Sequence, residues 1–129
     1  MKERVQQYLR TKWPAILWSV IVFILLAMPS IKLPTENKIE LTHIDKVIHF
    51  ILFFTLVALW GYYLQTKKRS KTKFLLALFA VTLISTFYGI LMEYVQLWTG
   101  RDFDVWDMVA DGVGAVAGWL LFAIKDKPR

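Results

Sequence analysis

Four long apolar stretches constrain the fold of this chain more than any other feature. They cover about residues 13–28, 47–64, 74–98 and 105–124. A helix needs about 20 apolar residues to cross the hydrocarbon core of a bilayer, and each stretch reaches or approaches that length. Hydrophobic residues make up 57% of the 129 residues, above the ~45–50% usual in soluble domains. The sequence therefore predicts an all-α, four-helix transmembrane bundle that forms one membrane domain over residues 1–129.

The first stretch is the shortest and follows a basic segment, as the apolar core of a signal peptide would. It lacks a small-x-small cleavage motif and leads instead into a polar connection that contains Pro29 and Pro34 and ends at about His43. Pro14 suits the first turn of a helix. We therefore expect this stretch to remain as a membrane anchor.

The basic residues predict the orientation of the bundle. Twelve of the sixteen lie before the first stretch, between the second and third, or after the fourth. Because loops rich in Lys and Arg stay in the cytoplasm, both termini are predicted to be cytoplasmic. The acidic residues show the opposite bias, since only Glu3 and Asp126 fall on the predicted inner side.

Charge and cysteine content exclude several classes of function. The net charge is +6, but the basic residues lie between apolar stretches, which indicates contact with membrane lipids and not with nucleic acid. The chain has no cysteine, so disulfides, thiolate metal sites and cysteine nucleophiles are excluded.

Several polar side chains fall inside the apolar stretches, where an ionisable group is costly and indicates function. These residues are His49, Glu93, Gln96, Asp107 and Asp111. Asp45 and His49 are four residues apart, as are Asp107 and Asp111, so each pair shares a helix face.

Small residues share those faces and predict close contact between helices. On these faces lie Ser85, Gly89, Gly114 and Gly118, and Gly112 is also expected to be a helix-packing residue. With the predicted topology, the polar ends of three helices meet at the outer membrane level and form a pocket that opens outward. Its expected ligand-binding residues are Asp45, Lys46, His49, Glu93, Gln96, Arg101, Asp107 and Asp111.

Two segments together resemble the VanZ-like membrane proteins. They are "DKVIHFILFFTL" and "EYVQLWTGRDFDVWDMVADGVGAVAG". The family pattern is Asp-Lys-x-x-His-Phe, then Glu-x-x-Gln, an Arg, an Asp, an Asn four residues later, and glycines. In this chain the pattern falls on Asp45, Lys46, His49, Phe50, Glu93, Gln96, Arg101, Asp107, Gly112, Gly114 and Gly118.

One position departs from this pattern, because Asp111 stands where the family usually has Asn. Asn is neutral and can donate a hydrogen bond, whereas an ionised Asp can only accept one. Asp111 is therefore expected either to be protonated or to pair with Lys46, His49 or Arg101.

The resemblance implies a protein of the bacterial cytoplasmic membrane and cell envelope, with a link to low-level resistance to the glycopeptide teicoplanin. It implies no particular reaction. The preferred interpretation is a binding protein whose ligand is a lipid-linked phosphate, a cell-wall precursor or a glycopeptide antibiotic. A small membrane enzyme that uses His49 with Glu93 or Asp107 in acid–base chemistry is the first alternative. An accessory or structural subunit is the second.

No cofactor is expected, since no spacing is diagnostic of a metal site. A divalent cation, if bound, would use His49, Glu93, Asp107 and Asp111 through hard oxygens and one imidazole. Lys46 and Arg101 could contact phosphate, or could neutralise Asp45 and either Asp102 or Asp104. Asp104 is also a candidate cap for the fourth helix.

Overall fold

The computed structural model describes residues 1–29 and 38–125, without the side chains of residues 38–42. The described residues form five helices and no strand: α1 (Lys2–Leu9), α2 (Trp13–Ala27), α3 (Lys38–Leu64), α4 (Lys71–Trp98) and α5 (Val105–Ile124). The predicted connection through Pro34 and the C-terminal charges Asp126, Lys127 and Arg129 lie outside the described residues. The all-α prediction is confirmed.

Three helices are long and apolar enough to cross a bilayer: α3 from His43 to Leu64, α4, and α5. The predicted first span corresponds to α2, whose 15 residues extend only about 22 Å. It qualifies as a fourth span only together with α1, and the two helices are bent by 70° at the break between them. The chain is therefore a multi-pass helical membrane protein with three spans, or four if α1 and α2 form one.

Local sequence explains where the helices begin and end. Ser70 caps α4 by accepting a hydrogen bond from the Lys73 amide, and Asp104 caps α5 by accepting one from the Trp106 amide. The turn between α4 and α5 contains Gly100, whose φ of 83° suits glycine. Helix α3 starts at Lys38, earlier than the predicted end of the polar connection at His43, because no proline or glycine interrupts the chain after Pro34.

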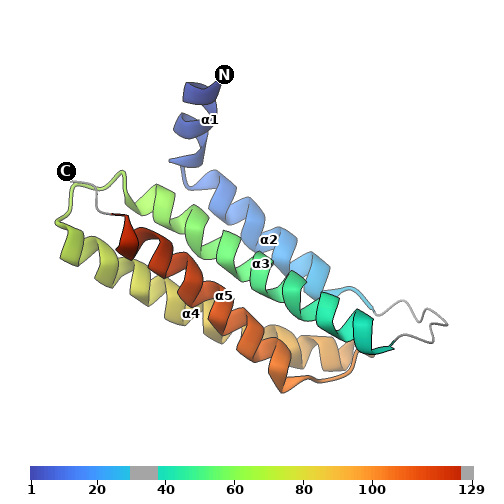
Figure 1. Cartoon of the computed structure of the whole chain (residues 1–129). Helices are drawn as coiled ribbons and strands as arrows, with labels where there is room; N and C mark the ends of the chain where they lie inside the picture. The colour runs from blue at the N-terminus through green and yellow to red at the C-terminus, as the bar shows by residue number, and fades with distance from the viewer. Residues whose placement is uncertain (30–37, 126–129) are drawn as a thin grey trace.

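Helices α3, α4 and α5 form a three-helix core (Figure 1). The most extensive contact joins α3 to α5. Helix α2 packs against α3 and α4 and makes no contact with α5. In Figure 1, α1 points away from the bundle. Helix α3 is thus the central helix, and residues on its α5 face are buried.

Glycines allow the backbones of α3 and α5 to come close together. A Cβ atom at Gly114 would overlap the carbonyl oxygen of Phe50. One at Gly118 would lie 3.0 Å from the carbonyl oxygen of Phe54 and 2.9 Å from Val57 Cβ. Larger residues at these positions would therefore push α5 away from α3.

Aromatic side chains connect the helices by hydrogen bonds to backbone carbonyls. The Trp18 indole donates to the Leu52 carbonyl, and the Trp119 indole donates to the Leu75 carbonyl, both at 2.9 Å. The Tyr88 hydroxyl donates to the Ser19 carbonyl at 3.0 Å. Such bonds satisfy the polar ends of large apolar rings within a membrane span.

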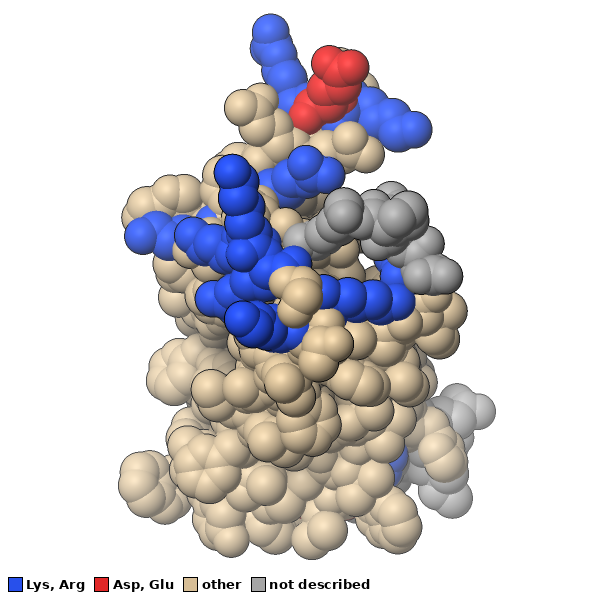
Figure 2. All heavy atoms as spheres, turned by 90° about the vertical axis from the view of Figure 1, so that its left-hand side faces the viewer, with Lys and Arg blue, Asp and Glu red and all other residues tan. Residues whose placement is uncertain are grey.

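Basic residues gather at one end of the bundle, which carries α1, the α3–α4 loop and the C-terminal end of α5 (Figures 1 and 2). The loop contributes Lys67, Lys68 and Arg69. The start of α3, the end of α4 and the start of α5 meet at the opposite end. The described parts of the three segments that were predicted to be cytoplasmic therefore share one end, whereas their orientation in a membrane stays a prediction.

Candidate functional site

Buried polar side chains meet at the end of the bundle opposite the basic residues. They come from α3, α4 and α5, and each is at most 4% exposed: His49, Glu93, Gln96, Asp107 and Asp111. All five are among the residues that the sequence predicts to bind a ligand. Ser85 and Gly89 are buried on the same face of α4, and a Cβ at Gly89 would collide with the Asp111 carboxylate. The absence of a side chain at Gly89 therefore makes room for Asp111.

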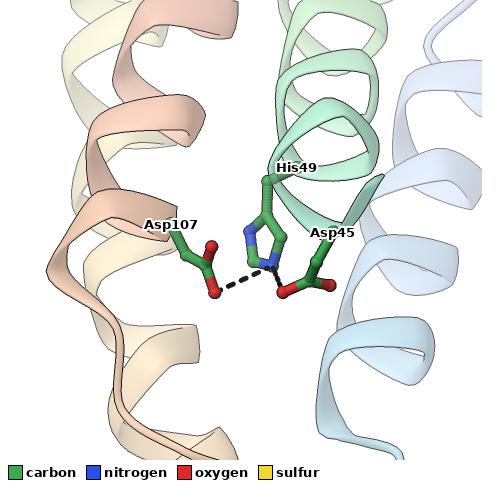
Figure 3. Close-up of side chains that lie close together, drawn as sticks. All are labelled: Asp45, His49 and Asp107. Carbon is green, nitrogen blue, oxygen red and sulfur yellow. Dashed lines mark ion pairs between the residues drawn. The ribbon is translucent and has the colours of Figure 1, made fainter. Parts of the chain in front are cut away.

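His49 is the centre of this cluster. Its Nδ1 lies 2.7 Å from Asp111 Oδ1, and both side chains are almost completely buried. Its Nε2 has no hydrogen-bond partner among the described residues. Nε2 instead faces two carboxylate oxygens, Asp45 Oδ2 and Asp107 Oδ2, each 3.8 Å away (Figure 3). An ionised Asp111 can only accept, so Nδ1 donates to it, and a neutral imidazole then directs a lone pair from Nε2 toward the two aspartates.

The second oxygen of each facing aspartate is held by a basic side chain. Arg101 Nη2 donates to Asp45 Oδ1 at 3.3 Å, and Lys46 Nζ donates to Asp107 Oδ1 at 3.1 Å. Each aspartate therefore has one oxygen in an ion pair and one directed at His49. The Arg101–Asp45 pair fits the interpretation of these two residues as neutralising groups, whereas Asp107 was not among the expected partners of Lys46.

Asp104 connects the site to the start of α5. Lys46 donates to Asp104 Oδ2 at 2.6 Å, and Asp104 Oδ1 caps the helix at the Trp106 amide. The Lys46 hydrogen bond is the main reason why the pKa of Asp104 lies below its ordinary value. The sequence indicated Asp104 only as a possible helix cap or neutralising partner. Its ion pair with Lys46 could not be predicted, because it depends on how the α4–α5 turn folds.

Glu93 and Gln96 lie on the α4 side of the cluster. Glu93 Oε1 accepts a hydrogen bond from the Asp104 amide at 2.7 Å. Glu93 Oε2 and Gln96 Nε2 have no partner among the described residues, and neither does Asp111 Oδ2. Four buried polar atoms at this end, counting His49 Nε2, thus have no hydrogen-bond partner among the described residues, which is unusual for buried polar groups.

The side chains that could hold a metal differ from the set expected from the sequence. His49, Asp107 and Asp45 each offer one ligand atom, and these atoms lie within 4.8 Å of one another. The expected set contained Glu93 and Asp111 in place of Asp45. The structure instead uses Glu93 to bind the Asp104 amide and Asp111 to hold the other side of the imidazole.

An apolar groove of about 500 Å³ runs between α3 and α5 and reaches Lys46. Its other lining residues are Val47, Phe50, Trp106, Val109, Ala110 and Val113. A second cavity of about 630 Å³ lies among α2, α3 and α4, and includes Ser85 and Tyr88 in its lining. Of these two, the first reaches Lys46 and so lies beside the His49 cluster.

Comparison with known proteins identifies the family of the chain. The sequence profile of the VanZ/LLP1 family matches residues 4–126, nearly the whole chain. The chain belongs to the VanZ/LLP1 family. The matched range includes every residue that the structure brings together around His49.

A relative of this VanZ/LLP1 chain occurs in the fission yeast Schizosaccharomyces pombe. It is 30% identical over 109 residues, which are 84% of this chain and 64% of the yeast protein. The chain thus spans somewhat less than two thirds of that relative, whose name is simply "uncharacterized protein". No solved structure matches the chain. A yeast relative also means that similar chains exist outside bacteria, and neither comparison names an antibiotic.

Proposed function

We propose that this VanZ/LLP1 protein binds an amphiphilic molecule of the cell envelope, with the polar head at the His49 cluster and the apolar chain in the α3–α5 groove. The proposed ligand class is a lipid-linked phosphate or a lipid-linked cell-wall precursor. The observation that carries this proposal is the continuity of the apolar groove with Lys46 and, through Lys46, with Asp107. A molecule with one polar and one apolar end would match both features.

The cost of burial supports a ligand at the polar end. Ionisable groups within membrane spans are energetically costly and usually mark functional sites. His49, Glu93 and Asp111 are at most 1% exposed, yet each keeps one polar atom without a partner among the described residues. A purely structural cluster would gain stability by pairing these atoms, so the missing partners favour binding of a ligand.

The groove supports an apolar chain as the second half of the ligand. Apart from Lys46, it is lined by aliphatic and aromatic residues of α3 and α5. Both helices are candidate membrane spans, and a chain lying in this groove would stay within the bilayer. A head group that reaches Lys46 would then be at the level of the cluster.

Charge distribution supports a ligand on the outer side of the cytoplasmic membrane. The basic end of the bundle (Figure 2) would face the cytoplasm according to the positive-inside rule. The His49 cluster would then face outward, where envelope precursors are assembled. A glycopeptide antibiotic is the alternative ligand suggested by the VanZ resemblance, and resistance to it would be a consequence of binding at the same end.

The pairing of His49 with Asp111 favours a second candidate function, catalysis on a lipid or lipid-linked substrate. A carboxylate that accepts the Nδ1 proton fixes the imidazole so that Nε2 can take a proton from a substrate or water. The distance of 2.7 Å is suited to that role. Turnover of a bound lipid would distinguish this enzyme from a binding protein.

Farnesyl phosphate and farnesol, in detergent, provide a matched pair of probes for the proposed ligand class. The native protein should bind farnesyl phosphate more tightly than farnesol, which lacks the phosphate. Val109→Trp should fill the groove and weaken binding about tenfold, equivalent to ~1.4 kcal/mol. Ile84 lines the second cavity, so Ile84→Trp serves as the control and should leave the affinity unchanged.

Tryptophan fluorescence is a suitable readout because Trp106 lines the groove. Equal affinities for the two probes, or equal losses in the two Trp variants, would contradict the proposed function. Release of inorganic phosphate from farnesyl phosphate, abolished in His49→Gln, would instead establish the enzymatic alternative.

A further inference from the structure

We propose that Asp45, His49 and Asp107 form a site for a divalent cation, which in turn bridges to the phosphate of the lipid ligand. The inference deepens the proposed function, and its second part rests on it. The site consists of one imidazole nitrogen and two carboxylate oxygens from α3 and α5 (Figure 3).

The orientation of the three ligand atoms is the first argument. His49 is 1% exposed, and its Nε2 is directed between Asp45 Oδ2 and Asp107 Oδ2 at 3.8 Å from each. Two atoms bound to one cation by bonds of about 2.1 Å are typically about 3.0–3.5 Å apart. The two distances from Nε2 exceed this range by only a few tenths of an ångström, and all three atoms lie within 4.8 Å of one another, so rotation of the two aspartate side chains would bring them to a common cation.

The groups behind the ligand atoms are the second argument. Arg101 holds the other oxygen of Asp45, and Lys46 holds the other oxygen of Asp107. Asp111 accepts from Nδ1 of His49. A histidine that binds a metal usually donates its second ring N–H to a carboxylate or carbonyl, which fixes the tautomer and orients the ring. All three candidate ligands are thus positioned by a neighbour that leaves the metal-facing atom free.

Electrostatics provides the third argument. The cluster contains five acidic residues, Asp45, Glu93, Asp104, Asp107 and Asp111, and two basic ones, Lys46 and Arg101. Both basic side chains are already paired with carboxylates. A phosphate approaching this cluster alone would meet excess negative charge, whereas a bound divalent cation reduces that charge and offers open coordination positions to phosphate oxygens.

Manganese(II) alone is the appropriate first probe, since the ligand set mixes imidazole with carboxylates and the ion is paramagnetic. Chelator-treated, full-length protein in detergent should bind one Mn²⁺ in titrations followed by electron paramagnetic resonance. Pulsed measurements should detect a directly bound ¹⁴N nucleus. The ¹⁴N coupling should disappear in His49→Gln.

Substitutions separate the roles of the residues. Asp107→Asn should weaken Mn²⁺ binding by about 100-fold or more, because it removes a charged ligand. Asp111→Asn retains a carbonyl oxygen that can accept from Nδ1, so the loss should be smaller, about tenfold. Asp102→Asn is the matched control, since Asp102 is an exposed acid of the preceding loop and its removal should leave the affinity unchanged.

Three results would overturn the cation site: no Mn²⁺ binding, equal affinities in Asp107→Asn and Asp102→Asn, or a ¹⁴N coupling that persists in His49→Gln. If a variant fails to fold, ¹⁵N spectra of the native protein provide the test instead. A His49 ring that stays doubly protonated when diamagnetic Mg²⁺ or Zn²⁺ is added would also overturn the cation site. Metal-independent binding of farnesyl phosphate would overturn the phosphate bridge and leave the cation site and the proposed function intact. Normal Mn²⁺ binding without any farnesyl phosphate binding would remove the proposed function and the phosphate bridge, but not the cation site.

Discussion

His49 lies in the middle of the polar site, and its two ring nitrogens face different groups: Nδ1 faces Asp111, and Nε2 faces Asp45 and Asp107. The spacing of Asp45 and His49 placed them on one helix face, and the structure has them in contact range. Asp111 was expected either to be protonated or to pair with one of three residues, and it pairs with His49. The sequence could not predict which oxygen of each aspartate faces His49, because that depends on where Lys46 and Arg101 come to lie.

The ion pair between Lys46 and Asp104 predicts a pH dependence of stability. The pKa of Asp104 is lowered from its ordinary value of 3.8, mainly by the hydrogen bond from Lys46. A carboxyl group whose pKa is lower in the folded state stabilises the fold above its unfolded pKa, and this contribution is lost as pH falls through the folded pKa. Asp104→Asn keeps a capping side chain but removes the charge. The native protein should melt at a higher temperature than this variant at neutral pH.

That difference in melting temperature should shrink as the pH falls below about 4. Thermal melts in detergent between pH 7 and pH 3 would measure it, with Asp102→Asn as the control for an exposed acid. A constant difference over the whole range would mean that Asp104 acts only as a helix cap.

At the scale of the helices, the α3–α5 contact holds the site together. Helix α3 carries Asp45 and His49, and α5 carries Asp107 and Asp111. The stripe of small residues on α5 predicted this close contact, and Gly114 and Gly118 lie where it is closest. Gly112 was also an expected packing residue, although it lies outside this stripe, and a Cβ there would make an ordinary contact, 3.4 Å from Thr86. At 100° per residue, Gly112 lies about 160° around the helix from Gly114, so it faces Thr86 of α4 while Gly114 faces Phe50 of α3.

Gly114→Ala should therefore destabilise the protein and disturb the site. The added methyl group would overlap the Phe50 carbonyl, and overpacking of this kind costs about 1–3 kcal/mol. Forcing α5 away from α3 would also separate His49 from Asp107 and weaken Mn²⁺ binding. Gly112→Ala is the matched control, since it should change the unfolding free energy by less than about 1 kcal/mol.

Chemical or thermal unfolding in detergent would compare these two glycine variants, with Mn²⁺ affinity as the second readout. Similar stability and similar affinity in both variants would show that the α3–α5 distance adapts easily and does not control the site.

At the scale of the whole molecule, apolar length and charge pattern predicted most of the architecture. Three of the four expected spans are long helices, and the fourth is α2, whose 15 residues are short for a bilayer. The sequence did not predict the separate helix α1 or the 70° bend before α2. The segment before α2 is polar, and its residues carry little information on the direction in which the chain continues from the end of α2. The meeting of three polar helix ends followed from topology alone. The cation-binding geometry did not, because it requires side-chain positions from two helices and a loop.

The opposite placement of the basic end and the His49 cluster leads to a prediction about orientation. Because the chain has no cysteine, single cysteines can be introduced without removing native ones. Thr66→Cys lies in the basic α3–α4 loop, and Asp102→Cys lies beside the polar site; both positions are exposed. Neither substitution removes a basic residue, so neither should alter the charge bias that sets topology.

In intact cells, a membrane-impermeant maleimide should label position 102, and it should label position 66 only after the membrane is permeabilised. Labelling of position 66 alone in intact cells would show the opposite orientation, with the proposed cation and lipid sites on the cytoplasmic side.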